Sequence, residues 1–264
     1  MPKYLTYSLL FFLIFACAET VKNEAKNNTV NPEPTKEAAI DTNLIDFIMG
    51  KFNPEKNKDF IKIPLEYADQ EGRFMHKEAF EAFVRMSAEA ASDGISLKIV
   101  SAARNFDYQK GIWERKWTGE TKLSTGEDAS VSYPDPSNRA RNILNYSSMP
   151  GTSRHHWGTD IDLNKFNNAW FESGDGLKLF NWLEKNAHLY GYCRPYTSKD
   201  SLRPFGYNEE KWHWSYLPIS EGLTNAADSL LKNKMIAGFK GSEVANQLDI
   251  VNKYVLGINH SCKH

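Results

Sequence analysis

Histidine and carboxylate side chains are concentrated in two short stretches of the chain. The first, Gly151–Leu163, contains two adjacent histidines, a glycine two residues after them and two aspartates one position apart. The second, Glu209–Trp214, contains a glutamate three residues before a histidine. A catalytic zinc ion commonly takes two histidines and one carboxylate and keeps a fourth position open for water. The two stretches therefore predict one metal site.

The spacing assigns a role to each of these side chains. We expect His155, Asp162 and His213 to be the three ligands, with a turn at Gly158 spanning the step between the first two. Glu210 is then placed as the base that takes a proton from the attacking water. A His-x₆-Asp spacing is weak evidence by itself, so the prediction depends on the downstream Glu-x-x-His.

The elements that must position these residues follow from apolar periodicity. Alternating and helical patterns predict several helices interspersed with short strands, two of which carry Asp162 and His213. Arg104 follows a predicted strand, and Gln109 comes a turn later, so both are placed to project into a cleft. The predicted helices cover 44–48, 76–93, 108–117 and 175–187, and two amphipathic helices follow residue 218. The predicted strands cover 60–65, 95–99, 161–163 and 212–216. The polar stretch 118–149 is predicted to be a long loop.

The composition limits the classes of function. Of the 264 residues, 41% are hydrophobic and 25% are charged, which is ordinary for a globular protein with a sizeable core. The net charge of −1 gives no electrostatic footprint for nucleic acid. Nothing in the sequence indicates a protein partner.

The N-terminus is predicted to be a targeting segment. Lys3 precedes an apolar run of about a dozen residues, too short to span a membrane that needs ~20. The run ends in Leu13–Cys17, which resembles a bacterial lipobox whose cysteine, Cys17, is acylated after cleavage. We expect a lipoprotein signal at 1–17, a tether at 18–41 and a membrane-anchored protein of the cell envelope facing the periplasm; plain secretion with Cys17 discarded is the alternative.

Three motifs in order resemble a known family. Ser153-x-His155-x-x-Gly158-x-x-x-Asp162, followed by Glu210-x-Trp212-His213, resembles the zinc D-alanyl-D-alanine carboxypeptidases of the vancomycin-resistance type. That family belongs to a group shared with lysostaphin-like endopeptidases and the hedgehog signalling domain. Ser101-Ala-Ala-Arg104 with Gln109 matches the family's upstream substrate-binding motif. The resemblance covers roughly Lys77 to Tyr216.

The resemblance implies a fold, a cofactor and a substrate. The fold would be α+β, with a small central antiparallel sheet flanked by helices. From the apolar pattern we place the peptidase domain at 42–218 and a C-terminal helical extension packed on it at 219–264. One zinc ion would be the cofactor and peptidoglycan stem peptides the substrate. Arg104 would hold the terminal carboxylate through its planar fork, while Gln109, Ser153 and Trp212 would complete the substrate-binding set.

Two rival functions stay open. A peptidoglycan endopeptidase or an L,D-carboxypeptidase could use the same scaffold, although Arg104 favours an enzyme that recognises a free carboxylate. A non-catalytic, zinc-stabilised binding module is the other alternative, against which Glu210 argues, because such a module needs no base beside the metal.

Departures from the family pattern leave the ligand register open. Asp160 stands where the family has a small residue, and on a strand it would share a face with Asp162, so either could be the ligand and the other could support it. Lys211 replaces a common proline after the base. His156 is an alternative to His155, although the motif favours His155.

Two cysteines remain after cleavage of the predicted signal. In an exported protein Cys193 and Cys262 could form a disulfide that fixes the C-terminal tail. Two free buried thiols would look the same in the sequence.

Overall fold

A computed structural model describes Met1 and residues 42–263. The predicted signal peptide, Cys17 and the tether at 18–41 lie outside the described residues. Within the described part, no helix is both long and apolar enough to cross a membrane.

Two small antiparallel sheets form the framework. The larger sheet has four strands in the order β3-β4-β6-β5, and β1 pairs with β2 to form the smaller one. The fold is therefore the α+β arrangement that the sequence predicts. The strands are β1 (Phe60–Lys62), β2 (Phe74–His76), β3 (Ile99–Ser101), β4 (Asp160–Leu163), β5 (Tyr192–Cys193) and β6 (His213–Tyr216).

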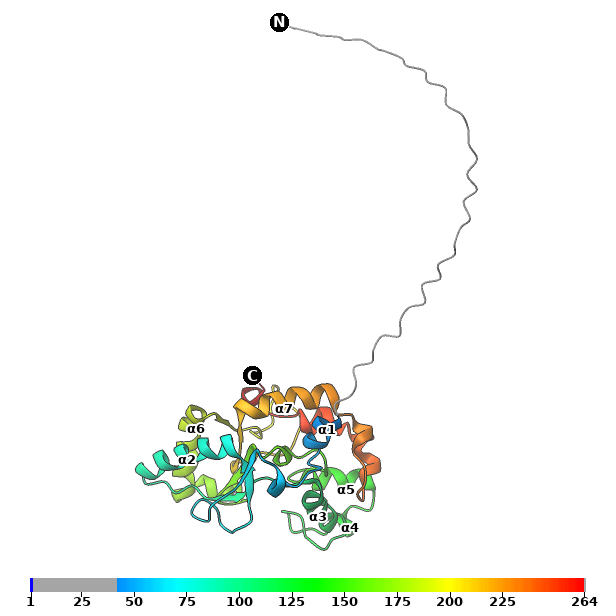
Figure 1. The fold of residues 1–264 in the computed structure, drawn as a ribbon. Helices are drawn as coiled ribbons and strands as arrows, with labels where there is room; N and C mark the ends of the chain where they lie inside the picture. Colours follow the sequence, from blue (N-terminus) through cyan, green and yellow to red (C-terminus); the bar gives the residue numbers. More distant parts are fainter. Residues whose placement is uncertain (2–41, 264) are drawn as a thin grey trace. The chain divides into compact units, whose positions relative to one another are not determined.

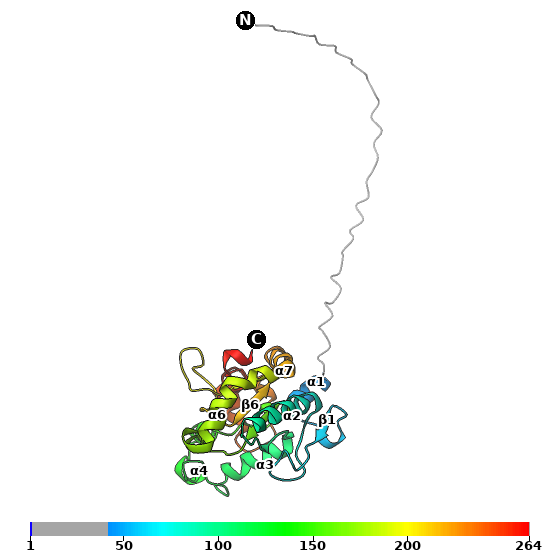
Figure 2. The same cartoon turned by 90° about the vertical axis from the view of Figure 1, so that its left-hand side faces the viewer.

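Eight α-helices occur among the described residues. In Figure 1, α2 and α6 lie together at the left, α3, α4 and α5 gather at the lower right, and α7 runs along the top; the turned view of Figure 2 keeps α2 beside α6. The helices are α1 (Thr42–Ile48), α2 (Lys77–Ser92), α3 (Phe106–Trp117), α4 (Ala129–Ser132), α5 (Pro136–Ile143), α6 (Gly174–Asn186), α7 (Leu217–Leu230) and α8 (Ala245–Leu248).

Alternation along β4 and β6 separates the core from the polar site. Successive side chains of a strand point to opposite faces. Ile161 and Trp214 belong to the apolar cluster that also contains residues of α2 and α6, so their polar neighbours in each strand face the other way. The register places Asp162 opposite His213 and Asp160 opposite Ser215. The Asp-x-Asp and His-x-Ser patterns thus form one buried polar face.

A second apolar cluster includes the C-terminal segments. It joins Trp113 of α3 and Ile143 of α5 to Ala227 of α7 and to Val251 in the π-helical turn Val251–Val255. The C-terminal tail therefore packs against α3, α5 and α7.

Several local predictions differ from the structure. The strand expected at 60–65 ends at Lys62. The strand expected at 95–99 instead runs from Ile99 to Ser101, because the pairing with β4 begins only at Ile99 and continues to Ser101. The stretch 118–149 contains α4 and α5, whose N-caps Asp128 and Asp135 accept backbone hydrogen bonds. The final amphipathic run is broken at Asp249, which has a positive φ of 51°.

Candidate functional site

The predicted ligand residues converge at the end of the larger sheet. His155 lies in the 3₁₀ turn Arg154–Trp157, Asp162 in β4 and His213 in β6. One ligand atom from each lies within 4.8 Å of the others, and all three side chains are buried. His155 Nε2 is 3.2 Å from Asp162 Oδ2, and His213 Nδ1 is 3.0 Å from Asp162 Oδ1.

Gly158 makes the approach of His155 to Asp162 possible. It ends the 3₁₀ turn with a φ of 71°, a conformation that L-residues with a side chain rarely adopt. A Cβ atom at this position would also lie 2.3 Å from Phe60 Cε1. The predicted turn at Gly158 is therefore confirmed, and it brings the chain from the ligand-bearing turn directly into β4.

The donor set fits a bound cation. The Nδ1 atom of His155 contacts the Ala102 carbonyl at 2.9 Å, which leaves Nε2 as a lone-pair donor toward Asp162. Asp162 Oδ1 has no hydrogen-bond partner in the described structure, although His213 Nδ1 is only 3.0 Å away. Both atoms belong to the group of side chains that converge closely enough to hold one ion. Two histidines and one carboxylate are a common zinc set.

Electrostatics also favours an ionised aspartate at this place. Burial alone would raise the pKa of the Asp162 carboxyl group. The neighbouring imidazoles of His155 and His213 outweigh burial and hold that pKa well below its usual range. Asp162 is therefore ready to act as an anionic ligand.

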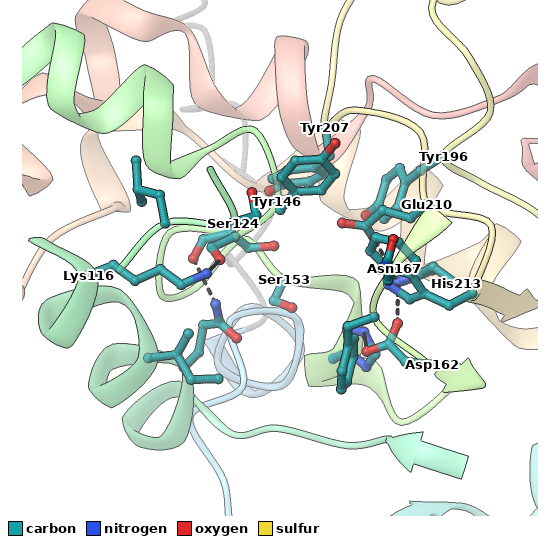
Figure 3. Close-up of a pocket in the computed structure, with 18 of the residues that line it drawn as sticks. Lys116, Ser124, Tyr146, Ser153, Asp162, Asn167, Tyr196, Tyr207, Glu210 and His213 are labelled. Atoms are coloured by element: carbon teal, nitrogen blue, oxygen red, sulfur yellow. Dashed lines mark hydrogen bonds and ion pairs between the residues drawn. The ribbon is translucent and has the colours of Figure 1, made fainter. Parts of the chain in front are cut away.

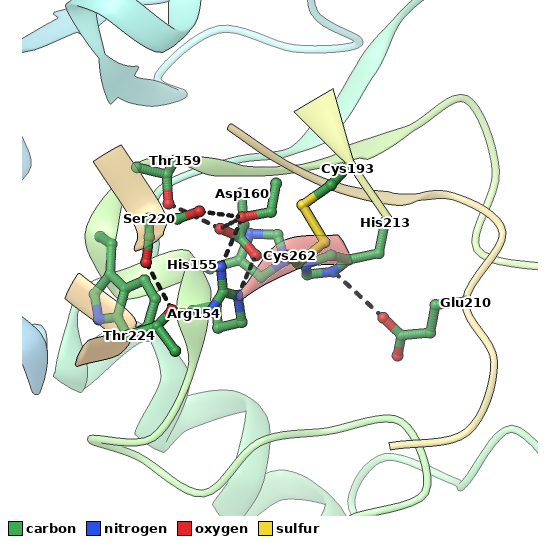
Figure 4. Close-up of polar contacts among 12 residues, drawn as sticks. Arg154, His155, Thr159, Asp160, Cys193, Glu210, His213, Ser220, Thr224 and Cys262 are labelled. Carbon is green, nitrogen blue, oxygen red and sulfur yellow. Dashed lines mark hydrogen bonds and ion pairs between the residues drawn. A yellow bond between two sulfur atoms is a disulfide. The ribbon is translucent and has the colours of Figure 1, made fainter. Parts of the chain in front are cut away.

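The doubled aspartate has two separate positions. Asp160 Oδ2 is 2.9 Å from His213 Nε2 and 3.0 Å from Arg154 Nε. It therefore contacts the nitrogen of the His213 ring that faces away from Asp162, and Asp160 is not one of the three converging residues. Its Oδ1 accepts hydrogen bonds from Ser215 and Thr159. Figure 4 shows this buried group of polar contacts around Asp160.

The second histidine of the pair is part of the backbone scaffold. His156 Nδ1 donates to the Arg104 carbonyl at 2.6 Å, and its Nε2 accepts the Gly151 N–H at 3.0 Å. Burial lowers the pKa of His156 to about 3, which matches a neutral ring with one donor and one acceptor. A Cβ at Gly50 would be 2.4 Å from that ring, so the glycine leaves room for it. Both ring nitrogens of His156 are therefore already used.

Glu210 lies beside the three converging residues. Its Oε2 is 3.3 Å from His213 Nδ1, and the residue is 6% exposed. Burial raises the pKa of Glu210, against the opposing effect of His213. Lys211 fixes the following backbone in a way that proline could not, because its N–H donates to Asn168 Oδ1 at 3.0 Å.

A cavity of about 750 Å³ opens onto these residues. Figure 3 shows Asp162 and His213 at one side of it, with Ser153 near the middle. All four predicted substrate-binding residues line it, namely Arg104, Gln109, Ser153 and Trp212.

Several polar atoms in this cavity have no partner in the described structure. The Oγ of Ser153 and Oε1 of Gln109 are buried without a hydrogen bond, as is Nε of Arg104. Gln109 Nε2 donates to the Ser148 carbonyl at 2.8 Å, so the free group is an acceptor suited to a peptide N–H. Buried polar groups are normally paired, which makes these atoms candidates for ligand contacts.

A family model described as VanY: D-alanyl-D-alanine carboxypeptidase matches residues 72–219, which include every predicted metal and substrate residue. The chain belongs to this family. It is therefore a peptidase of the hydrolase class.

Relatives of known sequence agree with the family. The chain is 28% identical over 236 residues to a putative carboxypeptidase, YodJ, of Bacillus subtilis, covering 76% of this chain and 77% of that protein. It is 26% identical over 130 residues to a D-alanyl-D-alanine carboxypeptidase of Enterococcus faecalis, covering 49% of this chain and 43% of that protein.

Solved structures with a similar fold include the LdcB LD-carboxypeptidase, with a TM-score of 0.48, 21% identity and coverage of 78% of this chain and 79% of that one. VanYB in complex with D-alanine-D-alanine has a TM-score of 0.46 and 21% identity, and the match covers 68% of this chain and 88% of that one.

Some residues of this VanY-family cavity carry no sequence motif. Tyr196 stacks obliquely on His213 with ring centroids 4.6 Å apart, and Tyr146 and Phe166 flank Trp212. Lys116 also lines the cavity. In the sequence, only the seven-residue spacing between Gln109 and Lys116 indicates that Lys116 could face the cavity, because it places both residues on one face of the predicted 108–117 helix.

The structure joins the two remaining cysteines. Cys193 of β5 and Cys262 form a disulfide across a sequence separation of 69 residues. It ties the last 3₁₀ turn, His260–Cys262, to the edge of the larger sheet.

Proposed function

We propose that this VanY-family peptidase is a zinc-dependent D,D-carboxypeptidase that removes the terminal D-alanine from peptidoglycan stem peptides. The observation that carries the proposal is the arrangement of His155, Asp162 and His213 around one point, with Glu210 beside them in the same cavity. The family to which the chain belongs supports the D,D-specificity.

The free carboxylate of the substrate is assigned to Arg104. Its guanidinium is anchored by one contact, from NH1 to Ser101 Oγ at 3.2 Å, and approaches Asp162 Oδ2 only to 4.0 Å. The remaining N–H groups can therefore form the paired hydrogen bonds that a carboxylate accepts. Ser153 and Gln109 then supply an adjacent hydroxyl group and an amide oxygen to the last peptide unit.

Glu210 is assigned as the general base. Its carboxylate is next to His213 but is not one of the three converging ligand atoms, so it is free to accept a proton from the attacking water and return it to the leaving amine. A zinc ion held by the three ligand residues supplies Lewis-acid chemistry, polarising the scissile carbonyl and acidifying water.

The proposed location is the cell envelope, facing the periplasm, with the chain anchored in a membrane through a lipid on Cys17. The disulfide between Cys193 and Cys262 supports export, because such bonds persist in oxidising compartments. The lipobox-like end of the apolar run supports acylation over plain secretion.

The test uses purified protein loaded with one equivalent of zinc and three muropeptides: a pentapeptide ending in D-Ala-D-Ala, the tetrapeptide, and a cross-linked dimer. We expect D-alanine release from the pentapeptide, its loss with a chelator, and recovery with zinc. Cleavage of the tetrapeptide or the cross-link, without any D-alanine from the pentapeptide, would replace the proposal by an L,D-carboxypeptidase or an endopeptidase.

A further inference from the structure

Helix α3 forms one wall of the cavity with a stripe of three side chains. Gln109, Ile112 and Lys116 line the cavity at spacings of three and four residues, which places them on one face of the helix. Arg104 lies just before the helix begins. The rise of an α-helix carries Lys116 about 10 Å beyond Gln109 along the axis. The wall therefore has a cation at each end.

Lys116 forms no ion pair with any described residue. Its Nζ donates to Ser147 Oγ at 2.5 Å, and no carboxylate between residues 42 and 263 lies within ion-pair distance of it. An ammonium group has three donors, so most of its hydrogen-bonding capacity is unused. Burial, and then the guanidinium of Arg104, lower the pKa of Lys116, and the carboxylate of Glu210 opposes them only in part. An anion placed beside it would offset both effects.

The two cations serve different parts of the cavity. Arg104 is at the metal-ligand end, 4.0 Å from Asp162, and its anchor Ser101 is paired with Asp162 in the sheet. Figure 3 shows Lys116 across the pocket from Asp162 and His213, with Ser153 between them. One carboxylate held at Arg104 therefore leaves the ammonium of Lys116 for a second anionic group.

The direction of the bound substrate peptide determines which of its groups can reach Lys116. Under the proposed function, on which this step rests, the substrate backbone ends at Arg104. Only the side chain of the terminal residue can continue toward Lys116. Ile112 and Leu123 offer apolar contact for methylene groups there, and the hydroxyl group of Ser147 lies beside Nζ.

We propose that Lys116 forms an anion subsite for a carboxylate on the side chain of the terminal residue. The cavity then accepts a dicarboxylic D-amino acid as the leaving residue, in addition to D-alanine. This makes Lys116 a specificity-determining residue rather than part of the clamp on the terminal carboxylate.

The experiment compares three N-acylated peptides that end in D-Ala-D-Ala, D-Ala-D-Glu and D-Ala-D-Gln. The last two differ only in the charge of the side-chain head group. With zinc-loaded protein we expect kcat/KM for the D-Glu peptide to exceed that for the D-Gln peptide about tenfold, since a charge-assisted hydrogen bond is roughly twice as strong as a neutral one. Lys116→Met should bring this ratio near one, and Lys116→Arg should keep most of it.

A binding measurement separates this proposal from the proposed function. The same peptides are titrated calorimetrically into Glu210→Gln protein, with and without Lys116→Met. Tighter binding of the D-Glu peptide that depends on Lys116 supports the subsite, even if the active protein cleaves none of the three. Equal affinities for D-Glu and D-Gln peptides, or an equal loss for all three peptides in Lys116→Met, would overturn it.

Discussion

Asp160 Oδ2 lies 2.9 Å from Nε2 of His213, while the other ring nitrogen, Nδ1, faces Asp162 Oδ1 at 3.0 Å. A histidine that donates one N–H to a carboxylate presents the lone pair of the other nitrogen to a metal. Arg154 neutralises the buried Asp160 from the opposite side at 3.0 Å and donates to Ser215 and Thr224. The orientation of His213 is thus fixed by a buried ion pair beneath the sheet.

Replacing Asp160 should weaken metal binding without removing a ligand. We expect Asp160→Asn to lower zinc affinity by about 10–100-fold, the usual effect of losing a carboxylate behind a ligating histidine. Competition with a chromogenic chelator measures this directly. The free energy of unfolding should also fall, by about 3–5 kcal/mol, because Arg154 is left buried without its partner.

Asp175→Asn is the matched control for Asp160→Asn. Asp175 is highly exposed and pairs only with Lys178 on the surface, so neither zinc affinity nor stability should change. Unchanged zinc affinity in Asp160→Asn would show that His213 is oriented without this carboxylate.

Glu210→Gln should separate catalysis from metal binding. We expect kcat for D-alanine release to fall by roughly 10²–10⁴-fold, the range for loss of a general base, while one equivalent of zinc is retained. Glu209→Gln is the neighbouring control, because Glu209 points to Arg194 at 2.8 Å and does not line the cavity. Retained turnover in Glu210→Gln would show that another group acts as the base. A non-catalytic binding module would instead show no turnover in either protein and unchanged ligand binding in the variant.

The polar face of the sheet could be predicted, because the alternation of side chains within each short strand determines it. Alternation in Asp160–Leu163 and in His213–Tyr216 determines which side chains share a face once the segments are strands. The separate positions of Asp160 and Asp162 could not, since they depend on the pairing of β4 with β6 and on the packing of Arg154, which is distant from Ser215 in the sequence.

The part of the cavity lined by residues 121–125 and 146–148 was the hardest part of the site to predict from the sequence. Residues 118–149 lack apolar periodicity, yet α4 and α5 form there, with aspartate caps and apolar contacts from Ala129 and Ile143. The position of Tyr146 beside Trp212 follows from this packing, because the two residues are far apart in the sequence. Tertiary contacts, which single-sequence patterns do not contain, decide such placements.

Cys17→Ser should release the protein from the membrane. Without the thiol that accepts the lipid, the chain should move from the membrane pellet to the soluble envelope fraction, as measured by fractionation and immunoblotting. Asp175→Asn is a suitable control, because it changes an exposed side chain and leaves Cys17 and the disulfide in place. Recovery of both variants in the membrane pellet would contradict the lipoprotein assignment.

The disulfide should contribute measurably to stability. Closing a loop of about 70 residues is worth about 4 kcal/mol in the chain-entropy description, so Cys193→Ser/Cys262→Ser should lower the free energy of unfolding by up to that amount. Urea titration of both proteins measures the difference. A reductant should destabilise the wild-type protein and leave the double variant unchanged, and equal stabilities without reductant would argue against the bond.

Arg104 should determine the requirement for a free terminal carboxylate. Each charge-assisted hydrogen bond contributes ~1.5–3 kcal/mol, so Arg104→Met should lower kcat/KM on a D-Ala-D-Ala peptide by roughly 10²-fold. The same peptide with a C-terminal amide should already be a poor substrate of the wild-type enzyme, and it should lose little more in the variant.

The ratio of acid to amide cleavage is therefore the informative measurement for Arg104. It should collapse in Arg104→Met and recover only partly in Arg104→Lys, since an ammonium group cannot form the planar paired contact. Arg115→Met, on the exposed side of α3, should leave the ratio unchanged. If Arg104→Met lowered both activities equally, the guanidinium would instead support Asp162, which it approaches to 4.0 Å, and the terminal carboxylate would have to be held elsewhere in the cavity.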